Sequence, residues 1–535
     1  MSRSIGLVAM MLLPTAFALH GEIYYVSPTG DDDYPGTISH PWETIQKAMN
    51  SATAGSTVNI LAGTYPERLT VNVSGTADNP IVFQNYGYTV SGSKAGEYEI
   101  GGDSVFLDYS TFGTITDGVP ALEINGQSYI RIQGLRFRNY QCTGAMQRGI
   151  WIHGTAAQVE LKHNTFTHFR NIGPWDGTCA LLNFWTDSPA HHVWIYGNEF
   201  GWIQSNYGEA VTPSAQDVTI ENNWIHDVDG IAVDAQIGSA GCIIRGNLLE
   251  WISRKRDGST WYNNPSNAIY TDGGNQIIIE RNTIRDSEYA IALLSEPGRP
   301  AAHDIIVRNN VAMRCRQAAF MAGTWYSDTD STVVYNCKFL NNTAYECAAG
   351  FLIRPFSSGS MVWKNNIIAS CEFPVMNTLL WPVGGMDYNL YYGGGAPGPD
   401  PHKITADPEF SDVSLEDFSL QSTSPAINSG DPDAATSNVG LFDFAGNSRI
   451  LGGRIDMGAS EYEAGPGMRF QAQGNTGGNS FRHYGFNFLR TNECAIPVVY
   501  DLFGKKTGNS EMKKNGIYFV RSPGSAAFQK LCKAK

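Results

Sequence analysis

Four acidic residues recur at a nearly constant distance after asparagines that themselves recur along the chain. They are Glu209, Asp234, Asp272 and Glu296, which follow Asn198, Asn223, Asn247 and Asn282. The distance is 11 residues for the first two, 11 for the third once an insertion within 253–267 is removed, and 14 for the fourth. Acids on adjacent repeats of a β structure would lie roughly 5 Å apart, or roughly 10 Å when two repeats apart, which brackets the separations used in retaining and inverting glycoside hydrolysis. Crowded like charges also raise the pKa of one carboxyl, as a general acid requires. The spacing predicts a catalytic pair, with Asp234 and Asp272 at its centre.

The same acids have two other interpretations. Calcium prefers hard carboxylate oxygens, and Asp227 and Asp229 would join Asp234 in such a site. The protein would then be a calcium-dependent lyase of uronate polymers, which also needs a cation and a Lys or Arg base. Alternatively, the acids lie on exposed strand edges and only oppose aggregation, in a non-catalytic protein that binds glycans.

Aromatic and cationic side chains in expected loops or at strand edges are candidates for substrate binding, because indole faces stack on sugar rings. They are Trp261, Tyr262, Arg254, Lys255, Trp202 and Trp185. The first four lie in the insertion at 253–267, which we expect to overhang Asp272.

An internal repeat predicts the elements that position these residues. Eight two-residue turns end in asparagine at intervals of 24 to 35 residues: Asn164, Asn198, Asn223, Asn247, Asn282, Asn310, Asn342 and Asn366. Five and three residues before each asparagine, and two and five after it, the residue is apolar except at Ser287. Alternation of period two indicates strands, and asparagine tolerates the left-handed backbone of a tight corner. The pattern predicts an all-β, right-handed parallel β-helix of about eleven coils between Tyr65 and Tyr392, with the asparagines stacked in a ladder.

The segment that precedes the repeats supports this interpretation by resemblance. Tyr24–Gly30 and Pro41–Ala48 resemble the N-terminal cap of the pectate-lyase-like β-helix superfamily, in which the second stretch is a short helix that plugs the solenoid. The resemblance implies a cap at 19–64, a β-helix at 65–405 and a closing segment at 406–463. The stretches around the four acids also resemble uncharacterised exported bacterial members. The superfamily holds lyases, hydrolases, esterases and non-enzymes, so the resemblance implies a fold rather than a reaction.

The two ends of the chain predict export. Residues 1–18 read as a secretory signal peptide, and no later segment is long enough to span a membrane. Residues 464–480 are rich in Gly, Asn and Gln and suggest a linker. Residues 481–535 are basic and resemble the small β-sandwich tails that sort proteins for export in Bacteroidetes-like and Fibrobacter-like bacteria, although a surface-binding β module is the alternative. We expect a secreted or cell-surface protein of a Gram-negative bacterium, with the export machinery as a partner.

Composition limits the remaining partners and cofactors. A net charge of −14 over 535 residues argues against nucleic acid. The nine cysteines show no zinc spacing, and Cys315, Cys347 and Cys371 fall in one inward column, as a buried stack or as a disulfide between coils. A capped solenoid needs no partner, so we expect a monomer. The acids predict that it degrades a plant or microbial polysaccharide, most simply as a glycoside hydrolase. A hydrolase of this kind should need no cofactor. If the protein is instead a lyase, we expect calcium as its cofactor.

Overall fold

The structure is a computed structural model, and it describes most of the chain up to residue 463. The described ranges are 21–144, 147–173, 179–183, 190–204, 208–257, 259, 266–296, 298–323, 334–354, 361–377, 385–395 and 399–463, followed by four strands after residue 497. The expected signal peptide and linker lie outside them.

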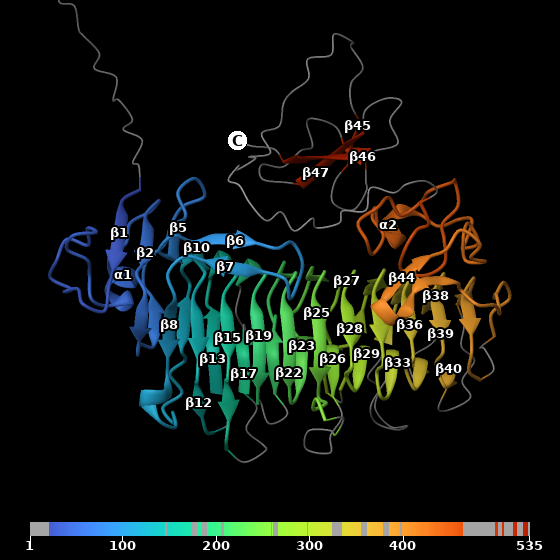
Figure 1. Cartoon of the computed structure of the whole chain (residues 1–535), viewed down its shortest axis with the longest axis horizontal. Helices are drawn as coiled ribbons and strands as arrows, with labels where there is room; N and C mark the ends of the chain where they lie inside the picture. The colour runs from blue at the N-terminus through green and yellow to red at the C-terminus, as the bar shows by residue number, and fades with distance from the viewer. Residues whose placement is uncertain are drawn as a thin grey trace, which may run out of the picture.

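The protein is a right-handed parallel β-helix, as predicted, and three long sheets run its length (Figure 1). The first sheet holds β1 (Ile23–Val26), β2 (Thr57–Ile60), β5 (Ile81–Asn85), β10 (Ser128–Gln133), β14 (Ala157–Lys162), β18 (His191–Tyr196), β21 (Thr219–Glu221), β24 (Ile243–Arg245), β27 (Ile278–Glu280), β31 (Ile306–Arg308), β35 (Lys338–Leu340), β38 (Val362–Lys364) and β41 (Met386–Asp387). The second holds β3 (Gly63–Tyr65), β8 (Val105–Asp108), β11 (Arg136–Arg138), β15 (Thr165–Thr167), β19 (Glu199–Ile203), β22 (Trp224–Val228), β25 (Leu248–Ile252), β28 (Thr283–Arg285), β32 (Val311–Met313), β36 (Thr343–Tyr345), β39 (Ile367–Ala369) and β42 (Leu390–Tyr392). The third holds β4 (Leu69–Val71), β9 (Leu122–Asn125), β13 (Gln147–His153), β17 (Cys179–Asn183), β20 (Glu209–Thr212), β23 (Ile231–Gln236), β26 (Asn267–Asp272), β29 (Tyr289–Leu294), β33 (Ala318–Gly323), β37 (Ala349–Ile353) and β40 (Phe373–Asn377).

The predicted asparagine ladder joins the coils at the corner between the first and second sheets. Asn198 Oδ1 accepts hydrogen bonds from the backbone N–H and the Nδ2 of Asn164, at 2.8 and 3.2 Å. The pattern repeats from coil to coil, includes Asn389, which the sequence analysis missed, and ends on the carboxylate of Asp400. Because each buried amide is satisfied, the ladder stabilises the stack without leaving an unpaired polar group.

One detail of the corner differs from the expectation. The left-handed residue is the one before each ladder asparagine, with φ between 53° and 65°: His163, Gly197, Asn222, Gly246, Arg281, Asn309, Asn341, Asn365 and Tyr388. The ladder asparagine itself has negative φ, since its role is to bond along the axis rather than to turn the chain.

The core is the inside of the solenoid, and every apolar position predicted from the repeat is buried. Ser287, the exception, is buried as well and donates its hydroxyl proton to the Arg285 carbonyl. The predicted cysteine column is a stack of buried free thiols, in which the Cys315 backbone N–H points at Cys347 Sγ at 3.4 Å. The described cysteines form no disulfide between coils.

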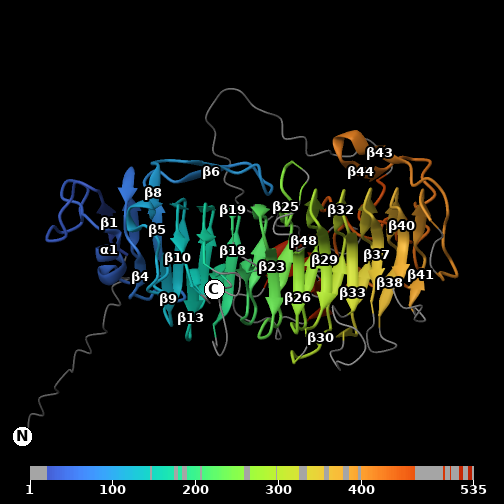
Figure 2. The same cartoon turned by 90° about the horizontal axis from the view of Figure 1, so that it is seen from below.

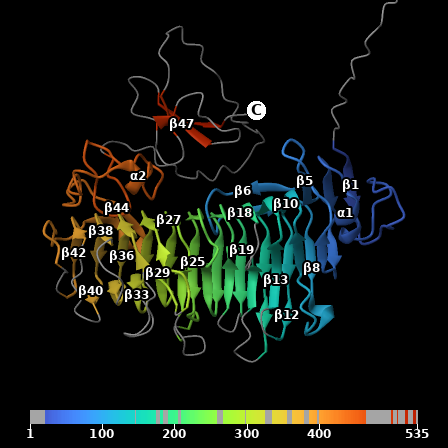
Figure 3. The same cartoon turned by 180° about the vertical axis from the view of Figure 1, so that it is seen from behind.

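The N-terminal end of the solenoid is covered by a short helix. Helix α1 (Ile45–Ser51) is capped by Thr44 and buries Ile45, Ala48 and Met49, as the resemblance implied. The hairpin β6 (Thr89–Ser91) and β7 (Glu99–Gly101) extends along the solenoid, as Figures 1 and 3 show.

The segment after residue 405 folds back instead of adding coils. It contains β43 (Phe410–Asp412), β44 (Asp417–Leu420) and α2 (Thr436–Val439), and it lies along the C-terminal coils in Figure 2. Its Glu416 pairs with Arg285 and Arg314, and its fully buried Arg449 pairs with Glu461 at 2.7 Å. These contacts fasten several coils together.

The last described strands are β45 (Val498–Tyr500), β46 (Lys506–Thr507), β47 (Ile517–Arg521) and β48 (Phe528–Cys532), which form a separate antiparallel sheet in the order β46-β45-β47-β48. Nowhere in the described ranges does the chain form a helix with the length and hydropathy of a membrane span.

Candidate active site

The four predicted acids lie on the third sheet. Glu209 opens β20, Asp234 lies within β23, Asp272 ends β26 and Glu296 follows β29. They form a diagonal rather than one edge, because Val211 is opposite Val233 and Gln236 is opposite Asp272. The constant distance from the ladder asparagine does not translate into a row, since the turns between the second and third sheets differ in length.

Side chains from the neighbouring coils draw the acids together. Glu209 leans along its strand toward Thr212, whose hydroxyl lies 3.5 Å from Glu209 Oε2 and level with Asp234. Glu296 donates its backbone N–H to Asp272 Oδ1 at 2.8 Å. Its carboxylate lies 3.5 Å from the hydroxyl of Tyr270, the residue opposite Asp234.

Arg299 is the cation of this group, and the sequence analysis missed it. Its Nε lies 3.2 Å from Asp272 Oδ2. Its positive charge partly opposes the rise in the pKa of Glu209, Asp234 and Asp272 that their burial causes. The only sequence signal was its position three residues after Glu296, in the turn that ends the coil.

Burial and the mutual repulsion of the acids favour their protonated forms, and the charge of Arg299 only partly opposes this. Burial and the charge of Glu296 raise the pKa of Glu209 to about 7. Burial raises the pKa of Asp272 to about 6, although the Glu296 N–H and Arg299 oppose the shift. Burial and the charges of Glu209, Asp272 and Glu296 raise the pKa of Asp234 well above its usual range. Near neutral pH the group therefore contains protonated and ionised carboxyls side by side.

The acids differ in their access to solvent. Asp234 is 4% exposed and Asp272 is 2% exposed, so the pair predicted to be central forms the floor of the group. Glu209, Glu296 and Arg299 are partly exposed and form its rim. A ligand that approached the sheet from solvent would meet the rim first.

An aromatic residue that the sequence analysis overlooked lies on the same sheet. Trp151 of β13 stacks on His153 with ring centroids 3.6 Å apart, and the Arg148 guanidinium lies 4.4 Å from its centroid. His153 in turn bonds Glu123 at 2.9 Å. The strand register leads from Trp151 through Asn183 to Thr212, so this tryptophan shares a row with Asp234. Its alternation within β13 was the signal that could have identified it.

Of the predicted substrate-binding residues, the three that the structure describes do not adjoin the acids. Trp261, Tyr262 and Trp185 lie outside the described residues. Arg254 and Lys255 precede β26, whereas Asp272 ends it roughly 16 Å along the strand, so this part of the insertion does not overhang Asp272. Arg254 instead donates to the Arg314 carbonyl at 3.3 Å. Trp202 is 47% exposed but belongs to the second sheet.

The three aspartates predicted for calcium are not grouped either. Asp227 belongs to the second sheet, where it bonds Arg256 and His226, both at 2.7 Å. Although burial opposes the change, these two partners lower the pKa of Asp227. Asp229 is buried in the corner that follows. The described part of the chain contains no cluster of three or more His, Cys, Asp or Glu that could hold a metal ion. The calcium requirement stays a prediction.

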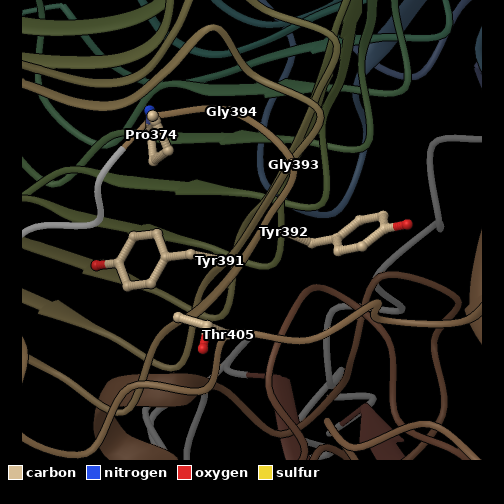
Figure 4. Close-up of a pocket in the computed structure, with 7 residues that line it drawn as sticks. Pro374, Tyr391, Tyr392, Gly393, Gly394 and Thr405 are labelled. Atoms are coloured by element: carbon tan, nitrogen blue, oxygen red, sulfur yellow. The ribbon is translucent and has the colours of Figure 1, made fainter.

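A depression of about 250 Å³ lies near the C-terminal end of the solenoid. Its lining contains Pro374, Tyr391, Tyr392 and the glycines that follow, and Figure 4 shows the two tyrosine rings pointing in opposite directions. It belongs to β40, β42 and the adjoining loops, several coils beyond the acids. It is therefore separate from the acidic group.

Comparisons with known proteins match the chain in two regions. Residues 24–174 match the family model "Pel9A-like, right handed beta helix region", and residues 253–386 match "Right handed beta helix region". An uncharacterised protein of Bacillus subtilis, YwoF, is 26% identical over 467 residues, which are 76% of this chain and 92% of that protein.

Two further matches are named as pectate lyases. Pectate lyase PEL9 of Emericella nidulans is 47% identical over 64 residues, so the match spans 12% of this chain and about a sixth of that enzyme (16%). The crystal structure of pectate lyase Pel9A is 14% identical, with a TM-score of 0.43, over 83% of this chain and 96% of that one.

Proposed function

We propose that the protein is an exported, carbohydrate-active enzyme that cleaves a polysaccharide by glycoside hydrolysis. The observation that carries the proposal is the group of four carboxyls around Arg299, in which the pKa of Glu209 is raised to about 7 and that of Asp272 to about 6. A general acid works best when its pKa lies near the working pH, and hydrolysis of a glycosidic bond needs such an acid beside an ionised carboxylate.

The rim acids are the candidates for the two catalytic roles because they are the partly exposed members of the group. They lie in or just after strands three positions apart in the third sheet, so the pair requires their side chains to lean toward one another along the diagonal. Glu209 would give its proton to the glycosidic oxygen as the bond to the anomeric carbon breaks. The Glu296 carboxylate would take a proton from the water that attacks that carbon, or would attack it directly.

Asp272 and Asp234, the floor acids, would not touch the substrate and would act by positioning the rim residues. Asp272 is a positioning residue, since it holds the Glu296 backbone at 2.8 Å and Arg299 at 3.2 Å. Asp234 would stay protonated beneath them.

A pectate-type lyase is the second candidate, favoured by the relatives named as pectate lyases. The Pel9A-like match ends at residue 174, before the first of the four acids. It therefore supports a shared solenoid and cap more directly than a shared reaction.

The deciding experiment incubates the full chain with pectins, xylans and other cell-wall glycans, with and without EDTA. New reducing ends without unsaturated uronide absorbance, lost in Glu209→Gln and Glu296→Gln, would support hydrolysis. The matched control is Glu160→Gln on the first sheet, where Glu160 pairs with Arg131 at 2.7 Å. Ultraviolet-absorbing products that disappear with EDTA would instead establish the lyase, and no product from any polymer would contradict both.

Export and sorting are part of the proposal. The signal-like residues 1–18 and the small antiparallel sheet at the C-terminus support it. Fractionation of cells that express the chain with and without residues 481–535 would test it, and an unchanged distribution would contradict a sorting role.

A further inference from the structure

The corner between the second and third sheets has a left-handed residue in each coil from Asn164 to Asn366, four positions after the ladder asparagine. With φ between 52° and 58°, these residues are His168, Trp202, Asp227, Trp251, Asp286, Arg314, Glu346 and Ser370. Left-handed backbone favours Gly, Asn and Asp, and it is unusual for a bulky side chain. Because Asp and Ser occupy the same position in other coils, corner geometry alone does not account for the two tryptophans.

Trp202 is exposed but held in place. It is 47% exposed, its ring stacks on His168 at 5.2 Å, and the edge of His226 meets it at 4.8 Å. His226 is fully buried and fixed by Asp227 at 2.7 Å and by Glu199 at 3.3 Å. The indole is therefore presented on a rigid base.

A glycine makes room for that base. A Cβ on Gly201 would lie 2.5 Å from the His226 ring, so any side chain there would displace the histidine. Trp224 stacks on the His226 ring as well, with ring centroids 3.9 Å apart.

The second tryptophan extends the surface along the axis. The strands β19, β22 and β25 are neighbours in the middle of the solenoid (Figure 1). Trp251 therefore lies two coils from Trp202, roughly 10 Å away, which is about the length of a disaccharide. Between them Asp227 bonds Arg256, whose guanidinium also lies 5.7 Å from the Trp251 ring. We call His168, Trp202, Asp227, Trp251 and Arg256 the corner strip.

We propose that the corner strip binds a segment of neutral polysaccharide, whose sugar rings stack on Trp202 and Trp251 while the exposed Arg256, held by the buried Asp227, donates to its hydroxyls. Two indoles with a polar pair between them match the alternating apolar faces and hydroxyl edges of a sugar chain. The site is on the second sheet and does not use the acids of the third, so it does not rest on the proposed reaction.

The charges at this corner favour a neutral chain over a uronate. Of the arginines described at this corner, three pair with carboxylates, Arg256 with Asp227, Arg285 with Glu250 and Arg314 with Asp286, and Arg254 donates to the Arg314 carbonyl at 3.3 Å. A uronate carboxylate would have to displace one of these partners.

The test is affinity electrophoresis of the full chain in gels that contain xylan, glucomannan, a mixed-linkage glucan or polygalacturonate. We expect retention by at least one neutral polymer and about five- to tenfold weaker retention for Trp202→Ala. Trp194→Ala is the matched control, because Trp194 of β18 is 38% exposed on the first sheet. Its retention should equal that of the wild type.

Three results would overturn the proposal: no retention by any neutral polymer, retention by polygalacturonate alone, or equal loss in both tryptophan variants. A measurement on the wild-type protein covers the case in which Trp202→Ala misfolds. Oligosaccharides of the retained polymer should protect Trp202, but not Trp194, from oxidation by N-bromosuccinimide, as read by peptide mass spectrometry. Equal oxidation of Trp202 with and without the oligosaccharide would contradict the site.

Discussion

Replacing Glu209 by glutamine should stabilise the protein at neutral pH while it removes activity. The pKa of Glu209 is about 7 in the folded chain, against an ordinary value near 4.5. The folded state therefore binds this proton more tightly than the unfolded state. The group's contribution to stability is complete below about pH 4.5 and is lost as the pH rises to 7. Glutamine has the same shape and cannot ionise, so it avoids that loss.

The size of the effect follows from the shift. A raise of about 2.5 units corresponds to at most ~3.4 kcal/mol. Because Glu209 is partly exposed, about 1 to 3 kcal/mol is the expected gain at pH 8, with no gain at pH 4. For a folded body of this size, that corresponds to a rise of about 1 to 3 °C in the thermal midpoint.

Differential scanning fluorimetry between pH 4 and pH 8 measures this difference, with Glu160→Gln as the control. Glu160 is ion-paired with Arg131, so its replacement should give no stabilisation at any pH. The reasoning would be refuted by a Glu209→Gln variant that is less stable than the wild type at pH 8, or by a gain that is the same at pH 4. Either result would mean that the carboxylate is not crowded by its neighbours.

Three further predictions test the rim, the sheet and the ladder. Replacing Arg299 by methionine should move the high-pH limb of the kcat/KM profile to a pH about one unit higher, because the positive charge of Arg299 opposes the rise in the pKa of Glu209. A limb at the same pH would mean that Arg299 does not influence the pKa of Glu209. Trp151→Ala should raise KM about five- to tenfold with little change in kcat, as loss of a stacking subsite does, and an unchanged KM in steady-state kinetics would exclude that role. Asn247→Ala should cost about 2 to 4 kcal/mol, since it removes the acceptor of two Asn223 donors, whereas Asn222→Gly at a left-handed position should be near neutral in the same denaturation assay.

The fold was predictable because its determinants are local and repeated. Each apolar residue around Asn247, for example, predicts its own burial without knowledge of distant contacts. The repeat then supplies many independent copies of the same pattern. The cap helix was predictable for the same reason, since Ile45, Ala48 and Met49 form one face within a single turn or so of helix. The left-handed position was assigned to the wrong residue of the turn because asparagine occupies both positions in several coils.

The site was less predictable because it depends on distances across coils. The counting that grouped Glu209, Asp234 and Asp272 found the correct sheet neighbours but not the diagonal, since register is set by turn lengths that sequence periodicity does not report. The same counting placed Arg254 above Asp272, although the strand between them separates the two. Arg299 and Trp151 were missed because their candidate roles depend on residues of other coils, the acids for Arg299 and the row that contains Asp234 for Trp151. Stacked coils bring residues some 25 positions apart into contact. A site in a solenoid is therefore formed by residues of different coils, and the pattern within one repeat does not show which of them meet. The repeat does not require a tryptophan at the corner after the second sheet, yet Trp202 and Trp251 lie there. A binding function independent of the acids should therefore be sought at that corner.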